Sequence, residues 1–327
     1  MSGKTTVLAF DFGASSGRAV KAVYDGAALS YEEVHRFENC PREKDGRLRW
    51  DFSALMDEVR TGLGKAGAVD SIGFDTWGVD FGLLGKNGTL LEDPVHYRDG
   101  RTAGMVEQAL RTMDARTLYG ATGNQIMAIN TLFQLLAVKE QAPEVWRRAK
   151  RLLFMPDLFI HALCGAQVCE RTIASTSQMQ DARTGAWDRD VLAAYRIPGA
   201  LENGAKVVAV AGHDTQCAVA ALPTQARDTA FLSCGTWSLL GCELDAPVLT
   251  EKSMRLGLSN ELGANGRVNY LKNIIGLWLI QESRRAWRRQ GREYSYAELE
   301  SLALEAAPLR CFIDPDDPAF TPPGDIP

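Results

Sequence analysis

The stretch that decides the fold is "TVLAFDFGASSGRAVKAVYDG", residues Thr6–Gly26. Two apolar runs, Val7–Phe12 and Arg18–Tyr24, flank a tip of small residues, and this arrangement predicts a β-hairpin. The first run carries one carboxylate, Asp11, to the edge of the tip. A tip of glycine, alanine and serine leaves its backbone N–H groups open to a ligand, and such groups suit phosphate oxygens.

The tip also offers side chains that bind anions. Ser15, Ser16 and Arg18 add hydroxyl and guanidinium donors. Asp11 would repel a phosphate unless a hard cation such as Mg²⁺ lay between them. The hairpin is therefore interpreted as a site for a metal-bound nucleotide. A plain β-turn without a ligand explains one such tip at least as well, and the tip lacks the Walker A spacing.

A second hairpin repeats the pattern in "TAFLSCGTWSLLGCEL", residues 229–244, with Gly235 and Thr236 at its tip. Two hairpins of this kind make coincidence less probable and indicate a duplicated α/β unit, with one copy in each domain. Between them, "KVVAVAGHDTQCAVAALP", residues 206–223, predicts a strand, a turn that carries an acid, and a helix. We expect domains at residues 1–222 and 223–327, with a hinge near Pro223–Asp228.

Hydrophobic periodicity predicts the remaining elements of the first domain. Ser30–Asn39 is typical of a half-exposed strand, and "SIGFDTWGVDFGLLG", residues 71–85, of a strand with a turn inside it. Asp51 is a plausible N-cap for a helix with an apolar face. That face would consist of Leu55, Met56, Val59 and Leu63, and further helices are expected at Thr102–Met113, Thr131–Gln141 and Pro156–Leu163.

Composition excludes several classes of function. The 327 residues include 36 Lys and Arg against 41 Asp and Glu, so no basic excess suggests a nucleic-acid partner. No apolar run is long enough to span a membrane, and no signal peptide is evident. Seven scattered cysteines without a C-x-x-C motif indicate reduced thiols in a cytoplasm. Four histidines without paired spacing argue against a structural zinc site.

Two carboxylates after predicted strands are candidates for chemistry. Asp214 ends a strand in a short turn and is suited to act as a base, although an N-cap on the following helix explains it equally well. In "DTWGVDF", acids flank an indole and a glycine. Sugar sites often combine carboxylates with an aromatic ring, but Trp77 by itself is more often a core residue.

Four polar residues leave two interpretations open. His213 is either a sugar contact or a buried, satisfied histidine. Asn273 lies in an apolar run, so its amide needs a partner, which is either a backbone group or a ligand. Arg98 and Arg101 either pair with carboxylates or lie solvated on a loop, and solvation is the default. The basic run "RRAWRRQGR", residues 284–292, is more often a solvated helix face than a nucleic-acid patch.

Taken in order, six motifs resemble the FGGY carbohydrate kinases, and within them the rhamnulokinase branch most closely. They are "FDFGASSGR", "DTWGVDF", "YRDGRT", "AGHDTQCAV", "SCGTWSLLG" and "NYLKNIIGLWLIQE". "DTWGVDF" and "LKNIIGLW" are the more specific to that branch, and the resemblance covers residues 7 to about 317. It implies an α/β, actin-like (ribonuclease H-like) fold, in which two domains close on a sugar and MgATP.

The same resemblance implies roles for individual residues. Asp214 matches the catalytic base and Asp11 the acid near the metal. The positions that match the binding of a ketose are Gly78, Asp80, His213, Thr215 and Asn273. The positions that match the binding of ATP are Ala14, Ser15, Ser16, Gly17, Arg18, Gly235, Thr236 and Gln281.

The implied reaction is phosphorylation of L-rhamnulose at O1 by ATP with Mg²⁺. L-fuculose and L-xylulose are alternative substrates, and the expected form is a monomer or a homodimer. Members of the family are longer than this chain, and the Gly-rich motif that packs against adenosine has no counterpart before Pro327. The connection at residues 196–206 is also short. The second domain is therefore expected to be incomplete, and a non-catalytic sugar-binding protein is the alternative from another class.

Overall fold

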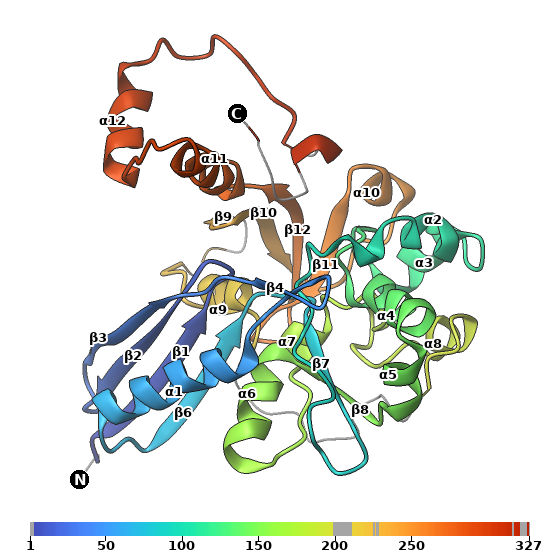
Figure 1. Ribbon diagram of the computed structural model, residues 1–327, viewed down its shortest axis with the longest axis horizontal. Helices are drawn as coiled ribbons and strands as arrows, with labels where there is room; N and C mark the ends of the chain where they lie inside the picture. Colours follow the sequence, from blue (N-terminus) through green and yellow to red (C-terminus); the bar gives the residue numbers. More distant parts are fainter. Residues whose placement is uncertain are drawn as a thin grey trace.

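The computed structural model describes residues 3–198, 211–224, 226, 229–315, 317–320 and 326. It contains two four-stranded sheets, one from the N-terminal part of the chain and one from the C-terminal part (Figure 1). The first sheet has the order β3 (Leu29–Glu38), β2 (Ser16–Tyr24), β1 (Thr5–Phe12), β6 (Ser71–Thr76). The second has the order β11 (Leu258–Leu262), β12 (Val268–Ile275), β10 (Trp237–Leu244), β9 (Ala230–Cys234). Only the β1–β6 pair is parallel among these neighbours.

The first predicted hairpin is confirmed as β1 and β2. Asp11 pairs with Arg18 in its register, and Phe12 pairs with Gly17. Leu8, Phe10 and Phe12 are fully buried on one face of β1. Because side chains alternate across a strand, Asp11 projects from the opposite face. A core strand can therefore deliver a carboxylate to the far side of the sheet without burying it in the hydrophobic core.

Helix α1 (Phe52–Ala66) covers the apolar face of this sheet. Its N-cap is Asp51, as predicted, and the Asp51 carboxylate accepts a 3.0 Å hydrogen bond from the N–H of Ala54. Gly62 allows close approach, since a Cβ there would lie 2.7 Å from the Phe10 ring. The packing of α1 fixes the plane of β1 and thus the position of the loop after it.

A mostly helical region follows in the chain, at the right of Figure 1. Leu118, Leu132, Phe133 and Phe154 are fully buried in its core. The elements of the first part of the chain outside the first sheet and α1 are β4 (Arg42–Lys44), β5 (Arg47–Arg49), β7 (Phe81–Leu84), η1 (Gly100–Thr102), α2 (Met105–Leu110), α3 (Ala115–Thr122), α4 (Thr131–Gln141), α5 (Pro143–Arg148), β8 (Arg151–Phe154), α6 (Met155–Cys164), α7 (Arg171–Ala174) and α8 (Arg189–Ala194).

Two predicted elements of this region differ in the structure. The stretch at residues 71–85 forms two strands in different sheets, because β7 pairs with β8 rather than continuing β6. The helix expected at Thr102–Met113 is shorter and begins only at Met105. Gly104 has φ +76° in the left-handed region, and this conformation separates the η1 turn from α2.

The second predicted hairpin is confirmed as β9 and β10. Helix α9 (Asp214–Ala220) contacts β6 of the first sheet and β9 of the second, so it lies between them. The remaining elements are α10 (Glu251–Arg255), α11 (Trp278–Arg289), α12 (Tyr296–Glu305) and η3 (Pro318–Phe320). No helix in the part of the chain that the structure describes has the length and hydropathy that a membrane span requires.

Two of the sequence predictions fall on residues that the structure does not describe. Most of the strand expected before Asp214, at residues 206–210, lies outside the described residues. So do residues 225, 227 and 228 of the expected hinge. The boundary between domains 1–222 and 223–327 therefore stays a prediction. The structure does place the end of the segment that leads into α9, because His213 forms a parallel bridge with Thr76 of β6.

Candidate active site

A cavity of about 470 Å³ lies between the two hairpin tips. Every residue that the sequence singled out for binding or catalysis lines it, except Gly17 and Asp80. One end is formed by both small-residue tips and by the start of α11. The other end is formed by the turn after β6, the start of α9 and strands β11 and β12. The structure thus brings together residues that are up to 270 positions apart in the chain.

The first tip is held in shape by its own backbone and by Asn39. The N–H of Gly13 donates to the carbonyl of Ser16 at 2.9 Å. Asn39 donates its backbone N–H to Ser15 at 3.1 Å and its Nδ2 to the carbonyl of Gly13 at 2.8 Å. Asn39 is almost completely buried. The sequence analysis missed it, although a polar residue that ends a strand next to such a tip is a usable signal.

Gly17 lies behind the tip rather than in the cavity lining. A Cβ at this position would overlap the ring of Phe37, so packing requires glycine here. In front of it, Arg18 donates from Nε and Nη2 to one oxygen of Asp11, at 2.8 and 2.5 Å. The predicted metal acid and the predicted phosphate ligand are therefore paired with each other.

The second tip contacts the first through α11. The Thr236 hydroxyl lies 3.4 Å from both amide atoms of Gln281. Gln281 Nε2 also donates to the Ser15 hydroxyl at 3.3 Å. The N–H groups of Leu277 and Trp278 donate to the carbonyls of Gly235 and Thr236. The start of α11 is thus fixed directly against the second tip.

Asp214 lies where the two ends of the cavity meet, as the first residue of α9. The preceding segment is held against β6 by a 2.9 Å hydrogen bond from the N–H of Thr76 to the carbonyl of Gly212. Oδ1 of Asp214 accepts from the N–H of Thr215 at 2.6 Å and from its hydroxyl at 3.3 Å. Removal from bulk water, assisted by the charge of Asp11, raises the pKa of Asp214 to about 7, and the hydrogen bonds from Thr215 oppose the increase.

Asp75 is the third carboxylate at this point, opposite Asp11 in the register of β1 and β6. Burial raises its pKa well above the ordinary value, and the charges of Asp11 and Asp214 raise it further, while Arg18 opposes them. Three carboxyl groups therefore share this place with the single guanidinium of Arg18. Among the described residues, no three His, Cys, Asp or Glu side chains are grouped closely enough to hold a metal alone. A hydrated cation bound partly by phosphate oxygens fits this arrangement.

The turn after β6 is strained and tightly packed. Val79 has φ +67°, which is costly for a β-branched residue. Its N–H donates to the Thr176 hydroxyl at 3.0 Å, and its carbonyl accepts from the Thr131 hydroxyl at 2.7 Å. A Cβ at Gly78 would lie 3.2 Å from Thr176 and 3.4 Å from Nε2 of His213. The turn therefore exposes backbone to the cavity at a point where a side chain would be tightly packed against Thr176.

Asp80 lies beneath this turn and is completely buried. Its Oδ2 accepts from Nε1 of Trp50 at 2.6 Å, Nε1 of Trp77 at 3.0 Å and the N–H of Tyr97 at 3.2 Å. Oδ1 accepts from Nε2 of Gln134 at 3.0 Å. Burial raises the pKa of Asp80 to about 6, and these donors oppose the increase. The structure places Asp80 where it organises the turn, outside the cavity lining.

The solvated position expected for Arg98 and Arg101 is wrong, because both are buried. The Arg98 guanidinium lies over the rings of Trp278 at 3.9 Å and Trp237 at 5.0 Å. Arg101 donates from Nη2 to Oε1 of Gln134 at 2.7 Å, and burial lowers its pKa to about 10. These positions follow from contacts between distant segments, which a local pattern of charges does not reveal.

At the far end of the cavity, Asn273 on β12 donates to the Ser259 hydroxyl at 3.5 Å. Two further lining residues, Glu261 on β11 and Gln125 after α3, were missed by the sequence analysis. The only sequence signal for Glu261 is the polar run "SNE" inside a buried strand. Oε1 of Gln125 is buried and has no hydrogen-bond partner among the described residues, so it is available to a ligand in the cavity.

Comparison with protein families gives two matches that together cover most of the chain. Residues 6–218 match the N-terminal domain of the FGGY family of carbohydrate kinases, and residues 230–327 match its C-terminal domain. The first match contains the first tip, the strained turn and Asp214. The second match contains the second tip, Glu261 and Gln281.

The chain is similar along nearly its whole length to curated rhamnulokinases. It is 39% identical to that of Bacteroides thetaiotaomicron over 99% of this chain and 71% of the relative. It is 38% identical to that of Enterococcus faecalis over 99% of this chain and 70% of the relative. The chain thus spans about seven tenths of the length of these relatives.

Solved structures show the same fold. The gluconate kinase of Lactobacillus acidophilus gives a TM-score of 0.72 at 16% identity, over 93% of this chain and 66% of that one. The glycerol kinase of Plasmodium falciparum with ADP gives 0.68 at 14% identity, over 92% and 67%. The predicted two-domain α/β sugar kinase fold is confirmed. From its sequence and its fold, the chain belongs to the FGGY family of carbohydrate kinases.

Proposed function

We propose that this chain phosphorylates L-rhamnulose at O1 with ATP as the phosphoryl donor. The rhamnulokinase relatives, 38–39% identical over nearly all of the chain, support this substrate over L-fuculose and L-xylulose. The position of Asp214 carries the proposal. Its carboxylate lies between the two phosphate-suited tips and the turn at Gly78, in a single cavity.

The nucleotide is assigned to the end of the cavity that the two tips form. Exposed backbone at Ala14–Ser16 and at Gly235 suits phosphate oxygens, with the hydroxyls of Ser15, Ser16 and Thr236 as further donors. Arg18 adds a guanidinium, and Gln281 adds an amide that already contacts both tips. The two domains thus grip one set of phosphates from opposite sides.

The ketose is assigned to the other end. Gly78 leaves room next to Nε2 of His213, while Thr215 and Asn273 supply a hydroxyl and an amide at the cavity wall. Asp80 supports the turn from below. Sugar sites combine a few fixed polar groups with a preformed wall, and this end of the cavity has both.

Asp214 acts as the base in this proposal. As the oxygen at C1 bonds to the γ-phosphorus, the bond to the ADP oxygen breaks, and the hydroxyl proton moves to the Asp214 carboxylate. A pKa of about 7 matches this task, because the ionised form is available near neutral pH and the group can hold the proton afterwards. The rest of the rate enhancement comes from the two domains, which hold the ketose and ATP in the right positions for the reaction.

A divalent cation fits the acidic point of the cavity. Asp11, assisted by Asp75 and Asp214, would hold Mg²⁺ through its water shell and the phosphate oxygens. When bound, Mg²⁺ neutralises charge that develops on the transferred group. The excess of carboxylates over the single guanidinium of Arg18 is the observation that favours this fit.

The test is ADP release from MgATP across a panel of ketoses, with Asp214→Asn beside the parent chain. We expect turnover selective for L-rhamnulose and a loss of about a thousandfold or more in Asp214→Asn. Turnover that persists in Asp214→Asn would contradict the assigned base. Binding of L-rhamnulose without binding of ATP would instead support the non-catalytic alternative.

The proposal includes a cytoplasmic location, where ATP is available. Cysteine usage supports it, since all seven cysteines are free thiols in the structure. Such thiols are typical of proteins in a reducing compartment. The test is alkylation of the native protein inside the cell, without a reducing agent, followed by mass spectrometry. The exposed thiols of Cys40, Cys164, Cys234 and Cys311 should be labelled.

A further inference from the structure

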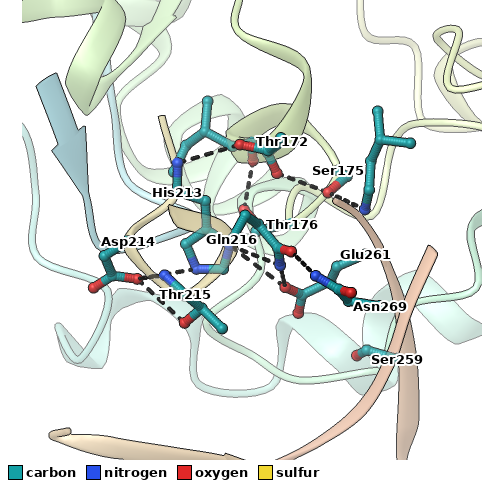
Figure 2. A network of polar contacts seen from close by, with 12 residues as sticks. Thr172, Ser175, Thr176, His213, Asp214, Thr215, Gln216, Ser259, Glu261 and Asn269 are labelled. Carbon is teal, nitrogen blue, oxygen red and sulfur yellow. Dashed lines mark hydrogen bonds and ion pairs between the residues drawn. The ribbon is translucent and has the colours of Figure 1, made fainter. Parts of the chain in front are cut away.

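Behind His213, on the side away from Asp214, lies a buried polar cluster (Figure 2). It consists of Gln216 on α9, Glu261 on β11 and Asn269 on β12. All three side chains are buried, and Glu261 is only 4% exposed. A buried carboxylate is costly unless it has partners, so its position calls for a physical reason.

The two ring nitrogens of His213 face different surroundings. Nε2 points toward the cavity, 3.4 Å from Oδ1 of Asp214 and next to the turn at Gly78. Nδ1 points inward and lies 3.4 Å from Oε2 of Glu261. Nε2 of Gln216 also lies 3.4 Å from Nδ1, but it is closer to Oε2 of Glu261, at 2.9 Å. Glu261 is the anionic group on the inner side, whereas Asp214 is the anionic group on the cavity side. The proton on this ring therefore has two competing positions.

The orientation of the Gln216 side-chain amide determines whether Glu261 donates or accepts a hydrogen bond. Asn269 Nδ2 donates to Oε1 of Gln216, which turns Nε2 of Gln216 toward the carboxylate. Nε2 of Gln216 then donates to Oε2 of Glu261 at 2.9 Å. Glu261 is thus arranged as a hydrogen-bond acceptor. An acceptor beside Nδ1 favours the proton on that nitrogen and leaves Nε2 with a lone pair.

Strand β11 is fixed to the first domain on both sides of Glu261. The N–H of Leu262 donates to the Ser175 hydroxyl at 3.0 Å, and the N–H of Asn260 donates to the carbonyl of Gly123 at 2.9 Å. The Tyr119 hydroxyl donates to the carbonyl of Leu258 at 2.9 Å. These bonds do not involve the Glu261 side chain, so they hold the strand in place when that side chain is changed.

We propose that Glu261 is a positioning residue of the sugar site. It holds His213 in the tautomer with the proton on Nδ1, so that Nε2 accepts a hydrogen bond from a hydroxyl of the bound ketose. The part that concerns the ketose rests on the proposed function, and the part that concerns the tautomer does not. Because Glu261 comes from the second domain and His213 from the first, the sugar site is complete only when both are in place.

Electrostatics agree with this arrangement. Burial raises the pKa of Glu261, and His213 and the hydrogen bonds from Gln216 and Asn273 oppose the increase. Burial lowers the pKa of His213, against the charges of Glu261 and Glu170. The tautomer requires a neutral imidazole, and the lowered pKa of His213 favours that form.

The first test is ¹⁵N NMR of the chain labelled at its four histidines, with His213→Gln to assign the signals. In the parent chain we expect Nδ1 of His213 to be protonated and Nε2 to be unprotonated. In Glu261→Gln, the new amide accepts from Gln216 through its oxygen and presents its NH₂ group to Nδ1. The proton should then move to Nε2. An unprotonated Nδ1 in the parent, or no change in Glu261→Gln, would overturn the proposal.

The second test is calorimetric binding of L-rhamnulose. We expect the dissociation constant to rise about tenfold in Glu261→Gln, the size expected for one lost hydrogen bond, with unchanged binding of ATP. Glu261→Asp keeps an acceptor and should recover part of the affinity. Glu243→Gln, on strand β10 of the same sheet, is the matched control and should change neither signal nor affinity.

The two tests keep the positioning role separate from the proposed function. If the parent chain binds no L-rhamnulose, the assigned substrate is wrong, and the NMR result still decides the tautomer. If the parent binds L-rhamnulose and Glu261→Gln binds it equally well, Glu261 has no role in positioning the sugar. Thermal unfolding of each variant identifies a general loss of structure, which would lower ATP affinity as well.

Discussion

Gln281 on α11 donates a 3.3 Å hydrogen bond to the hydroxyl of Ser15 in the first tip. The bond joins the two domains at the end of the cavity assigned to the nucleotide, and the same amide contacts Thr236. Gln281→Ala should therefore weaken ATP binding about fivefold and leave L-rhamnulose binding unchanged. Calorimetric titration with each ligand separately measures both quantities.

The matched control for this prediction is Gln290→Ala. Gln290 lies at the exposed end of the same helix, away from both tips. It should bind ATP as the parent chain does. Equal losses in the two variants would mean that Gln281 acts only through the stability of α11.

The activity should depend on pH through Asp214. Its pKa is raised to about 7, so the carboxylate becomes protonated as the pH falls through 7 and can no longer accept the hydroxyl proton. We expect kcat/KM for L-rhamnulose to be level above about pH 7 and to fall tenfold per pH unit below it. A profile that stays level down to about pH 5 would mean that another group is the base.

Asp190→Asn provides the matched control for Asp214→Asn. Asp190 occupies the first turn of α8 as Asp214 occupies the first turn of α9, but it is exposed and outside the cavity lining. Asp190→Asn should keep full activity with an unchanged pH profile. Asp214→Asn should lose activity, together with the fall in rate below pH 7 that Asp214 causes. A loss in both variants would indicate a general effect of an acid in the first turn of a helix rather than catalysis.

The parts of this molecule that could be predicted from sequence are those fixed by neighbours in the chain. The hairpins follow from apolar runs around small residues, and Asp51 caps α1 through a bond to a residue three positions away. A turn within residues 71–85 was predicted, but its left-handed conformation at Val79 was not, because Thr131 and Thr176, far along the chain, hold it. Nothing local in "WGVDF" indicates that the chain leaves one sheet there and enters another.

The residues of the candidate site divide in the same way, into those that the sequence located and those that depend on distant contacts. Both tips and Asp214 lie within contiguous motifs, so the sequence located them. Glu261 is defined by its contacts with His213 and Gln216, which lie more than 40 residues earlier. Arg98 is buried by Trp278, 180 residues later. Charged side chains whose burial depends on such distant partners are normally exposed, so the default interpretation failed for them.

Asp80 should be essential to stability. Asp80→Ala removes the acceptor of four hydrogen bonds, from two indoles, one amide and one backbone N–H, all in a completely buried place. The Gln134 amide still has the carbonyl of Ile129 as an acceptor, so three donors are left without a partner. At about 1 kcal/mol or more for each, the free energy of unfolding should fall by about 3 kcal/mol. Chemical denaturation followed by tryptophan fluorescence reports directly on Trp50 and Trp77.

The control for Asp80→Ala is Asp57→Ala. Asp57 forms an exposed ion pair with Arg60 on α1, which should contribute less than about 1 kcal/mol. If Asp80→Ala were no more destabilising than Asp57→Ala, the polar cluster beneath the turn would not hold it. The strain at Val79 would then need another source of support.

Arg98 should connect the two domains through its stacked guanidinium. It comes from the loop after Tyr97 in the first domain and lies against Trp237 and Trp278 of the second. Because lysine lacks the planar group that stacks on indole rings, Arg98→Lys should keep the charge and still lose most of the interaction. A desolvated cation–π contact is worth about 2 kcal/mol, so the apparent thermal midpoint should fall by a few degrees.

Arg288→Lys tests whether any such change is specific. Arg288 lies on the same helix as Trp278 but is exposed and paired with Glu293, where lysine serves as well as arginine. It should leave the thermal midpoint unchanged. Because Arg98 connects the domains next to the cavity, Arg98→Lys should also weaken both ligands at once, unlike Gln281→Ala and Glu261→Gln. A loss confined to one ligand would place Arg98 in that ligand's site instead of at the junction between the domains.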